Sequence, residues 1–208
     1  MKSLYRITVM GLALICASVI TVNAQLGEDA LVEYRQGNYT RAVEITQTEI
    51  EADPGRIDAY VVLGWSLMAL GRHQEANQWM QRAVEIRRWD ARVLHVLGES
   101  HYRLGNLEQA IQYLQEYIAV NPYGNLRAQV HFFLGDIFYQ IGEYHHADIA
   151  FSSAVEVSGR NPHWWVRLGQ AREQSGNMQL ARQAYENALE LQPNVPEAVA
   201  GMDRLSTR

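Results

Sequence analysis

The chain has 208 residues, with 18 Lys and Arg against 23 Asp and Glu, so its formal net charge is −5 at neutral pH. This acidic balance argues against nucleic acid or an anionic lipid surface as the main partner, because both carry negative charge themselves. The length is enough for one domain.

The first 24 residues have the pattern of an export signal. Lys2 and Arg6 give a positive start, an apolar run extends from Ile7 to Ile20, and Val22-Asn23-Ala24 supplies small residues for cleavage. We therefore predict a signal peptide over residues 1–24 and an exported protein, periplasmic or secreted, that begins at Gln25.

Two alternatives to cleavage concern the same segment. An uncleaved membrane anchor is the first, but the apolar run from Ile7 to Val22 has only 16 residues, which is short for a membrane span. Lipidation at Cys16 is the second, and Ile15 stands where such signals usually carry a small side chain. Cleavage would leave 18 − 2 = 16 bases against 23 acids, a charge of −7. It would also remove the only cysteine, and with it any disulfide, thiol nucleophile or cysteine-ligated metal.

Three columns of small residues recur through the rest of the chain. The first column consists of Gly37, Gly71, Gly105, Gly142 and Gly176, separated by 34, 34, 37 and 34 residues. Two further columns with the same spacings contain Ala30, Gly64, Gly98, Gly135 and Gly169, and Ala42, Ala76, Ala110, Ala147 and Ala181. Self-similarity at a period of this length indicates a repeat protein.

Each repeating unit is predicted to be helix, turn, helix. Apolar residues have helical spacing around the small residue, as in Leu63-Gly64-x-x-Leu67. The next glycine falls where that helix must end, because glycine accepts the left-handed conformation. The small residues inside the helices let neighbouring helices approach. The large residues expected to fill the space beside them are Met80, Leu114, Phe151 and Tyr185.

In chain order, the predicted units are residues 25–56, 57–90, 91–124, 125–161 and 162–195, followed by a capping helix and tail over 196–208. Prolines mark unit ends, since proline cannot continue a helix interior, and Asn161 is expected to cap the helix that Pro162 opens. Three extra residues around Tyr123–Asn125 account for the 37-residue interval. We interpret them as a geometric joint, with a functional loop as the other interpretation.

The repeat resembles the tetratricopeptide repeat family. Trp165-x-x-Leu168-Gly169, followed by Ala181-x-x-x-Tyr185 and Pro193, is the best match, whereas the first unit is degenerate, with Leu26, Thr46 and Glu49 departing from the pattern. The resemblance implies an all-α fold: a right-handed superhelical solenoid of antiparallel helix pairs, with about five repeats and a C-terminal capping helix.

The resemblance also implies a concave groove, lined by the first helix of each pair, that binds a protein or peptide. The groove residues carried over from the family pattern are Tyr34, Trp65, Met68, Arg92, His95, Glu99, Tyr102, Arg103, Phe132, Asp136, Tyr139 and Gln170.

The aromatic residues and arginines at these positions could either bind a partner or stabilise the protein itself. Tyr and Trp dominate protein-binding hot spots, but the same rings could be ordinary core aromatics. Arg92 and Arg103 could pair with a partner's carboxylates, or with Glu99 and Asp136 of the same groove. Some family members hold a terminal carboxylate with asparagines, and Trp65, Glu99 and Asp136 occupy those positions here, which argues against that mode.

Metal and catalytic sites are not expected. His145 and His146 are adjacent, so on a helix they point in different directions, and His95 and His101 are six residues apart. The sequence contains no Gly-x-Ser-x-Gly motif and no glycine-rich phosphate loop. We predict no enzyme activity, no cofactor and no metal.

The predicted function is a non-catalytic protein-interaction scaffold or adaptor of the cell envelope. Its partner is a protein or peptide and not nucleic acid, and membrane contact would come only through an uncleaved signal or through that partner. The alternatives are a permanent subunit of an envelope or outer-membrane assembly complex, which would use an apolar convex face around His131, Trp164, Trp79 and Trp89, and a carrier of a small ligand.

Overall fold

The computed structural model describes residues 29–207, so the predicted signal peptide, its cleavage site and Leu26 lie outside the described residues. Within that range the chain forms eleven α-helices and no strand, which confirms the all-α prediction. The helices are α2 (Ala30–Arg35), α3 (Tyr39–Ala52), α4 (Ile57–Ala69), α5 (His73–Ile86), α6 (Ala91–Arg103), α7 (Leu107–Val120), α8 (Arg127–Gln140), α9 (Tyr144–Val157), α10 (Pro162–Gln174), α11 (Met178–Leu191) and α12 (Pro196–Ser206).

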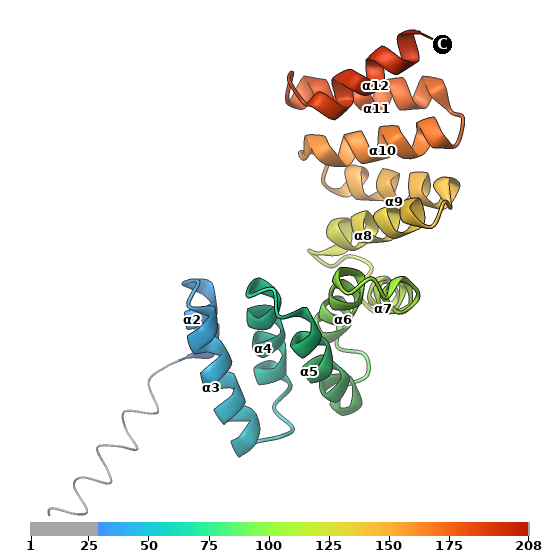
Figure 1. The fold of residues 1–208 in the computed structure, drawn as a ribbon. Coiled ribbons are helices and arrows are strands. Elements are labelled where there is room, and N and C mark those ends of the chain that lie inside the picture. Colours follow the sequence, from blue (N-terminus) through green and yellow to red (C-terminus); the bar gives the residue numbers. More distant parts are fainter. Residues whose placement is uncertain (1–28, 208) are drawn as a thin grey trace, which may run out of the picture.

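The helices stack in the order of the sequence, each beside its neighbours along the chain (Figure 1). A solenoid of helix pairs results, in which α2, α4, α6, α8 and α10 are the first helices of their pairs. Among residues 29–207, no helix is long and apolar enough to cross a membrane.

The predicted glycine turns end the first helix of every pair. Gly37, for example, has φ of 84°, its amide donates to the Tyr34 carbonyl, and the Asn38 amide donates to the Glu33 carbonyl at 2.9 Å. This pair of hydrogen bonds is the Schellman motif, which satisfies carbonyls that the helix end leaves free. The four later glycines of the column also have positive φ and make the same pair of bonds.

The second column of small residues permits close helix packing. A Cβ atom on Gly98 would lie 2.5 Å from Leu114, and one on Gly135 would lie 2.6 Å from Phe151. A Cβ atom on Gly64 would lie 2.9 Å from Met80, and one on Gly169 would lie 2.5 Å from Tyr185, so all four predicted filler residues are confirmed. In the degenerate first unit the filler is Thr46, which is fully buried and donates its hydroxyl to the Ala42 carbonyl at 2.7 Å.

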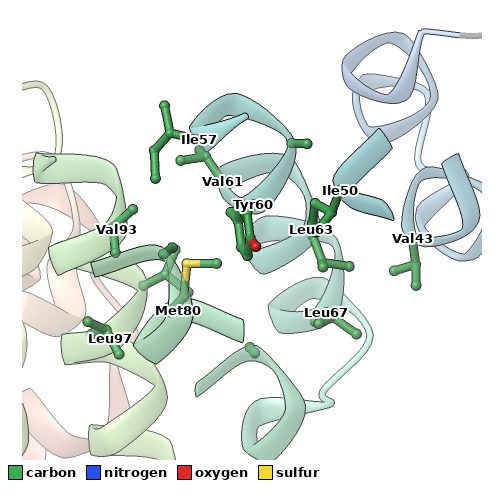
Figure 2. Packing of buried hydrophobic residues seen from close by; sticks show 14 residues of the cluster. Val43, Ile50, Ile57, Tyr60, Val61, Leu63, Leu67, Met80, Val93 and Leu97 are labelled. Atoms are coloured by element: carbon green, nitrogen blue, oxygen red, sulfur yellow. The ribbon is translucent and has the colours of Figure 1, made fainter. Parts of the chain in front are cut away.

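The apolar core follows the solenoid as a series of connected clusters. In the N-terminal half, Met80 of α5 lies between Tyr60 of α4 and Val93 and Leu97 of α6 (Figure 2). Because each helix buries residues mainly against its immediate neighbours, the repeats stabilise one another in sequence.

The predicted joint changes the direction of the stack. Between α7 and α8 the connection spans six residues, 121–126, whereas the connection 87–90 between α5 and α6 spans four. Helix α8 has 14 residues, where α4, α6 and α10 have 13. Two extra connection residues and one extra helical residue account for the insertion of 37 − 34 = 3. Figure 1 shows α2 to α6 stacked in one direction and α8 to α12 in another.

The C-terminal helix caps the last repeat. Helix α12 buries Ala198, Gly201 and Leu205 against the preceding pair. Pro162 opens α10, and the Asn161 side chain accepts a hydrogen bond from the His163 amide at 3.0 Å, as expected for a capping residue.

Candidate functional site

The first helices of the pairs carry all the predicted groove residues, and the structure places most of these residues in three groups. An aromatic cluster on α2 and α4 contains Tyr34, Trp65 and Met68. A polar network joins α6, α8 and α10. A pocket beside the joint contains Arg103 and Phe132.

In the aromatic cluster, the rings of Tyr34 and Trp65 lie 5.7 Å apart. Both rings are partly exposed, and Trp65 and Met68 also pack against the core of α3 to α6. Trp65 lines a cavity of about 540 Å³, which extends along α4 from Asp58 to Trp65 and reaches Arg92 of α6. Each of these rings is therefore partly core and partly surface.

Arg92 is held by acids on two sides. Its guanidinium bonds Asp90 at 2.7 and 3.0 Å, and it reaches Asp58 of the preceding unit at 2.7 Å. Burial acts to raise the pKa of Asp90, but the hydrogen bonds and charge of Arg92 outweigh it and hold that pKa below its usual value. Arg92 thus pairs within the protein, although with neither of the predicted partners, Glu99 and Asp136.

His95 lies in the interior, not on the groove surface. Its side chain is 6% exposed, and its ring packs edge-on against Tyr117 of α7. Val61 and Val166, at the equivalent positions of the second and fifth units, are also buried, whereas Phe132, at the equivalent position of the fourth unit, is only half-buried. Burial lowers the pKa of His95, and among the described residues neither ring nitrogen has a hydrogen-bond partner. His95 therefore has no surface with which to contact a partner in the groove.

The polar network is centred on the Asp136 carboxylate of α8, which is 14% exposed. It accepts hydrogen bonds from the Tyr102 hydroxyl of α6 at 2.7 Å and from the Gln140 amide at 2.7 Å, and it forms an ion pair with Arg167 of α10. Arg167 also donates to Gln170 at 2.9 Å. The network therefore connects the first helices of three consecutive units.

Tyr102 and Tyr139 both interact with members of this network. Burial, together with the hydrogen bond to Asp136, raises the pKa of Tyr102 to about 12. The Arg167 guanidinium lies 4.3 Å from the centre of the Tyr139 ring, a cation–π contact. Most polar side-chain atoms of Tyr102, Asp136, Tyr139 and Gln170 are therefore already paired within the protein.

The pocket beside the joint has a volume of about 550 Å³. Its walls include the ring of Phe132, which stacks on Trp164 of α10 at 5.0 Å and 16°, and the buried ring of Phe133. Asn125 and Gln129 add side-chain amides at the rim. We call this cavity the joint pocket; its lining consists of Arg103, Asn125, Ala128, Gln129, Phe132, Phe133, Val157, Ser158 and Trp164.

Among residues 29–207, Arg103 is the only charged residue in the lining of the joint pocket. Its guanidinium lies 5.8 Å from the Phe133 ring and 5.6 Å from the Tyr102 ring. A single bond of 3.3 Å to Glu99, one helical turn away, matches one of the two predicted interpretations. The side chain of Arg103 is still 46% exposed, so most of its five N–H donors remain available to a ligand.

Sequence reasoning missed Arg167 and misplaced Trp164. Arg167 stands in a repeat position that is apolar in the second, third and fourth units, where it is Val62, Val96 and Phe133, and this change to a charged residue was a readable signal. Trp164 was assigned to the convex face, but the structure places it in the joint pocket, because it stacks on Phe132.

The other residues of the predicted convex patch are scattered. Trp79 packs against the core and lies 6.0 Å from the Tyr60 ring, and His131 is half-buried, while Trp89 is 60% exposed. Within residues 29–207, no group of three or more His, Cys, Asp or Glu side chains is placed to hold a metal ion.

Stacked helix pairs with glycine turns and small-residue contacts define the chain as an α-solenoid of helix–turn–helix repeats. Models of the tetratricopeptide repeat match residues 29–92, 67–130 and 162–195. The chain belongs to the tetratricopeptide repeat family.

Solved structures with the same fold include MamA, with a TM-score of 0.71, 22% identity, and coverage of 80% of this chain and 95% of that chain. YrrB, described as a tetratricopeptide protein with an unusual peptide-binding site, has a TM-score of 0.71 and 18% identity, with coverage of 84% and 88%. At these identities the likeness establishes the fold alone.

Curated relatives are larger proteins. The CTR9 homolog of Arabidopsis thaliana is 24% identical over 86% of this chain and 17% of its own length. Tetratricopeptide repeat protein 7B of Homo sapiens is 26% identical over 62% of this chain and 15% of its own length. The chain therefore spans less than a fifth of the length of these two relatives.

Proteins of the family bind protein or peptide partners and are typically non-catalytic, so the fold supports an interaction scaffold.

Proposed function

We propose that this protein is a non-catalytic scaffold of the cell envelope that binds a protein or peptide segment in its concave groove. The observation that carries the proposal is the joint pocket, where partly exposed aromatic rings and a half-exposed arginine line a cavity of about 550 Å³. Cavities of this size, with apolar walls and a few polar groups, are typical of binding sites.

Site-specific photo-crosslinking in living cells tests the groove. A photoreactive residue at Gln129, in the lining of the joint pocket, is expected to crosslink a distinct protein. The matched control is Ile149 on the second helix of the same pair, which is 67% exposed. The proposal fails if Ile149 gives the same product, or if Gln129 gives none while the labelled protein remains folded and abundant.

Support for the envelope location comes from the residues 1–24, with their positive start, apolar run and small cleavage-site residues. Fractionation of the native cell, followed by N-terminal sequencing, tests it. The expected result is a chain outside the cytoplasm that begins at Gln25. A cytoplasmic chain that retains Met1 would contradict the location without affecting the groove.

One observation favours a permanent assembly subunit as the second candidate. Trp89 and Tyr123, which occupy equivalent positions in consecutive units, are 60% and 87% exposed. They lie in the connections that follow α5 and α7. Crosslinks from position 89 with none from Gln129 would favour this candidate over groove binding.

A further inference from the structure

We propose that the joint pocket recognises an acidic-x-aromatic motif: an extended peptide segment in which an internal Asp or Glu lies two residues from an aromatic side chain. This inference rests on the proposed function and specifies the partner of the same groove. The motif follows from three properties of the pocket, which are its charge, its apolar walls and the distance between them.

Charge selects the acid. Arg103 is the only charged residue in the lining, and the protein as a whole has a net charge of −5, so this cation stands out in an acidic molecule. Its guanidinium lies over the rings of Tyr102 and Phe133, and its one hydrogen bond within the described part of the chain goes to Glu99, at 3.3 Å. A second carboxylate can therefore bind the free side of the guanidinium by charge-assisted hydrogen bonds.

Apolar walls select the aromatic ring. Phe132 and Trp164 stack face to face and are each half-buried, and the buried ring of Phe133 also lines the pocket. An inserted ring would contact these three in the offset or edge-on geometries that aromatic pairs prefer. Among the described residues, the side-chain amides of Asn125 and Gln129 make no hydrogen bond, so they remain available to the backbone of the bound segment.

Geometry sets the spacing. The Arg103 guanidinium lies 5.8 Å from the centre of the Phe133 ring. In an extended chain, side chains two residues apart project to the same side and are separated by about 6.6 Å. An acidic side chain and an aromatic side chain at this spacing would reach the guanidinium and the apolar walls together.

An internal acid fits better than a terminal carboxylate. Capture of a chain end requires several converging donors, whereas here one arginine carries the charge and Glu99 lies beside it. A chain passing along the groove keeps its single carboxylate on Arg103 and places the ring in the pocket.

The test uses capped synthetic peptides with a Glu-Ser-Phe core in Gly/Ser flanks, titrated against the full chain by NMR or fluorescence anisotropy. Replacing Glu by Gln in the peptide is expected to weaken binding about fivefold, the effect of one partly exposed ion pair. Replacing Phe by Ser should weaken it further. Testing the apolar half on the peptide avoids substitutions at Phe132 and Trp164, which also support the fold.

Charge reversal on the protein completes the test. Arg103→Glu is expected to bind the Glu-Ser-Phe peptide at least about fivefold more weakly and to bind a Lys-Ser-Phe peptide more tightly than the unaltered protein does. Arg103→Gln, which adds no repulsion with Glu99, should remove the preference for Glu over Gln. The control is Arg35→Glu, the same change at the equivalent position of the first unit and outside the joint pocket.

Two results would overturn the motif: equal binding of the Glu and Gln peptides by the unaltered protein, or an Arg103→Glu variant that binds the Glu-Ser-Phe peptide within twofold of the unaltered protein. If a partner still crosslinks to Gln129, groove binding stands and only the motif is wrong. If no crosslink forms at Gln129 either, the proposed function falls with it.

Discussion

Gly98 and the other glycines at its repeat position each face one large side chain from the following helix. Gly98 meets Leu114, Gly135 meets Phe151, and Gly169 meets Tyr185. The large side chain differs from unit to unit, but in each of these units the lack of space beside it requires a glycine at the small position. The sequence predicts this pairing because both partners recur at fixed spacing.

Gly98→Ala is expected to lower the stability of the protein by about 1–2 kcal/mol. The added Cβ would lie 2.5 Å from Leu114 Cδ2 and 3.3 Å from the Leu114 amide nitrogen, and this overpacking exceeds the gain in helix propensity. Urea unfolding measures the change. Gly55→Ala is the control, because its nearest neighbour would be at an ordinary 3.4 Å, and a loss of similar size there would refute the steric explanation.

His95 makes stability depend on pH. Burial lowers its pKa below the usual 6.5, with Glu99 opposing the shift, so below that pH the unfolded chain binds more protons than the folded one. Stability is therefore fully present above pH 6.5 and is lost as the pH falls toward the lowered folded pKa. His101 and His131, whose pKa values burial also lowers, add to the same trend.

His95→Phe is expected to reduce this loss, because a phenyl ring fills the same space without taking up a proton and Phe132 occupies the equivalent position of the fourth unit. Thermal midpoints measured at about pH 7.5 and about pH 5 test it. His145→Gln, at an exposed histidine, is the control. Identical pH dependence in His95→Phe and the unaltered protein would show that His95 contributes nothing.

At the scale of elements, α12 is attached to the last pair through a buried carboxylate. Glu173 of α10 is 7% exposed by its side chain and accepts hydrogen bonds from the Tyr185 hydroxyl at 2.9 Å and from Arg204 of α12 at 2.8 and 3.0 Å. Burial, together with the bond to Glu173, raises the pKa of Tyr185. Tyr185 also fills the space between Gly169 and Gly201, so one side chain contacts all three C-terminal helices.

Arg204→Ala is expected to destabilise α11 and α12 by about 1 kcal/mol, a value reduced for solvent screening because Arg204 is 48% exposed. Hydrogen exchange measures it: amides of these two helices should exchange faster, while those of α4 and α5 keep their rates. The control is Arg182→Ala, which removes a different arginine whose guanidinium donates to the Leu205 carbonyl of α12. Comparison of the two variants separates the loss of the Glu173–Arg204 ion pair from the loss of another contact with α12. Unchanged exchange in α12 of Arg204→Ala would exclude the ion pair as its attachment.

Helices and turns were predictable from sequence, whereas the polar contacts between helices were not. The glycine that ends each first helix and the spacing of apolar residues are both features of a single unit, so the sequence of that unit is enough to predict its helices and turn. In the Tyr102–Asp136–Arg167 network, the interacting side chains are 34 and 31 residues apart in the sequence. Whether such side chains meet depends on how the superhelix positions one helix against the next. For the same reason, the predicted groove positions included the buried His95 and omitted Arg167. They did include Arg103 and Phe132, which the structure places in the joint pocket.

At the scale of the whole molecule, the joint sets the angle between the two halves. Deleting residues 123–125 restores the 34-residue spacing and is expected to redirect α8 to α12. Spin labels at the exposed positions Thr48 and Glu186 would report a shifted distance with helix content unchanged. Tyr123→Ser, which keeps the length, should leave the distance as it is; an unshifted distance in the deletion variant would show that the insertion does not direct the stack.

Helix α6 belongs to both halves of the groove. Arg92 near its start lines the cavity beside Trp65, and Arg103 at its end lines the joint pocket, about 16 Å away along the helix axis. A ligand with two short motifs separated by about five extended residues would span this distance. Once one motif is bound, the linker, and not the amount of ligand in solution, sets the concentration at which the second motif meets its cavity. Two weak contacts would then hold a partner with an avidity that neither supplies alone.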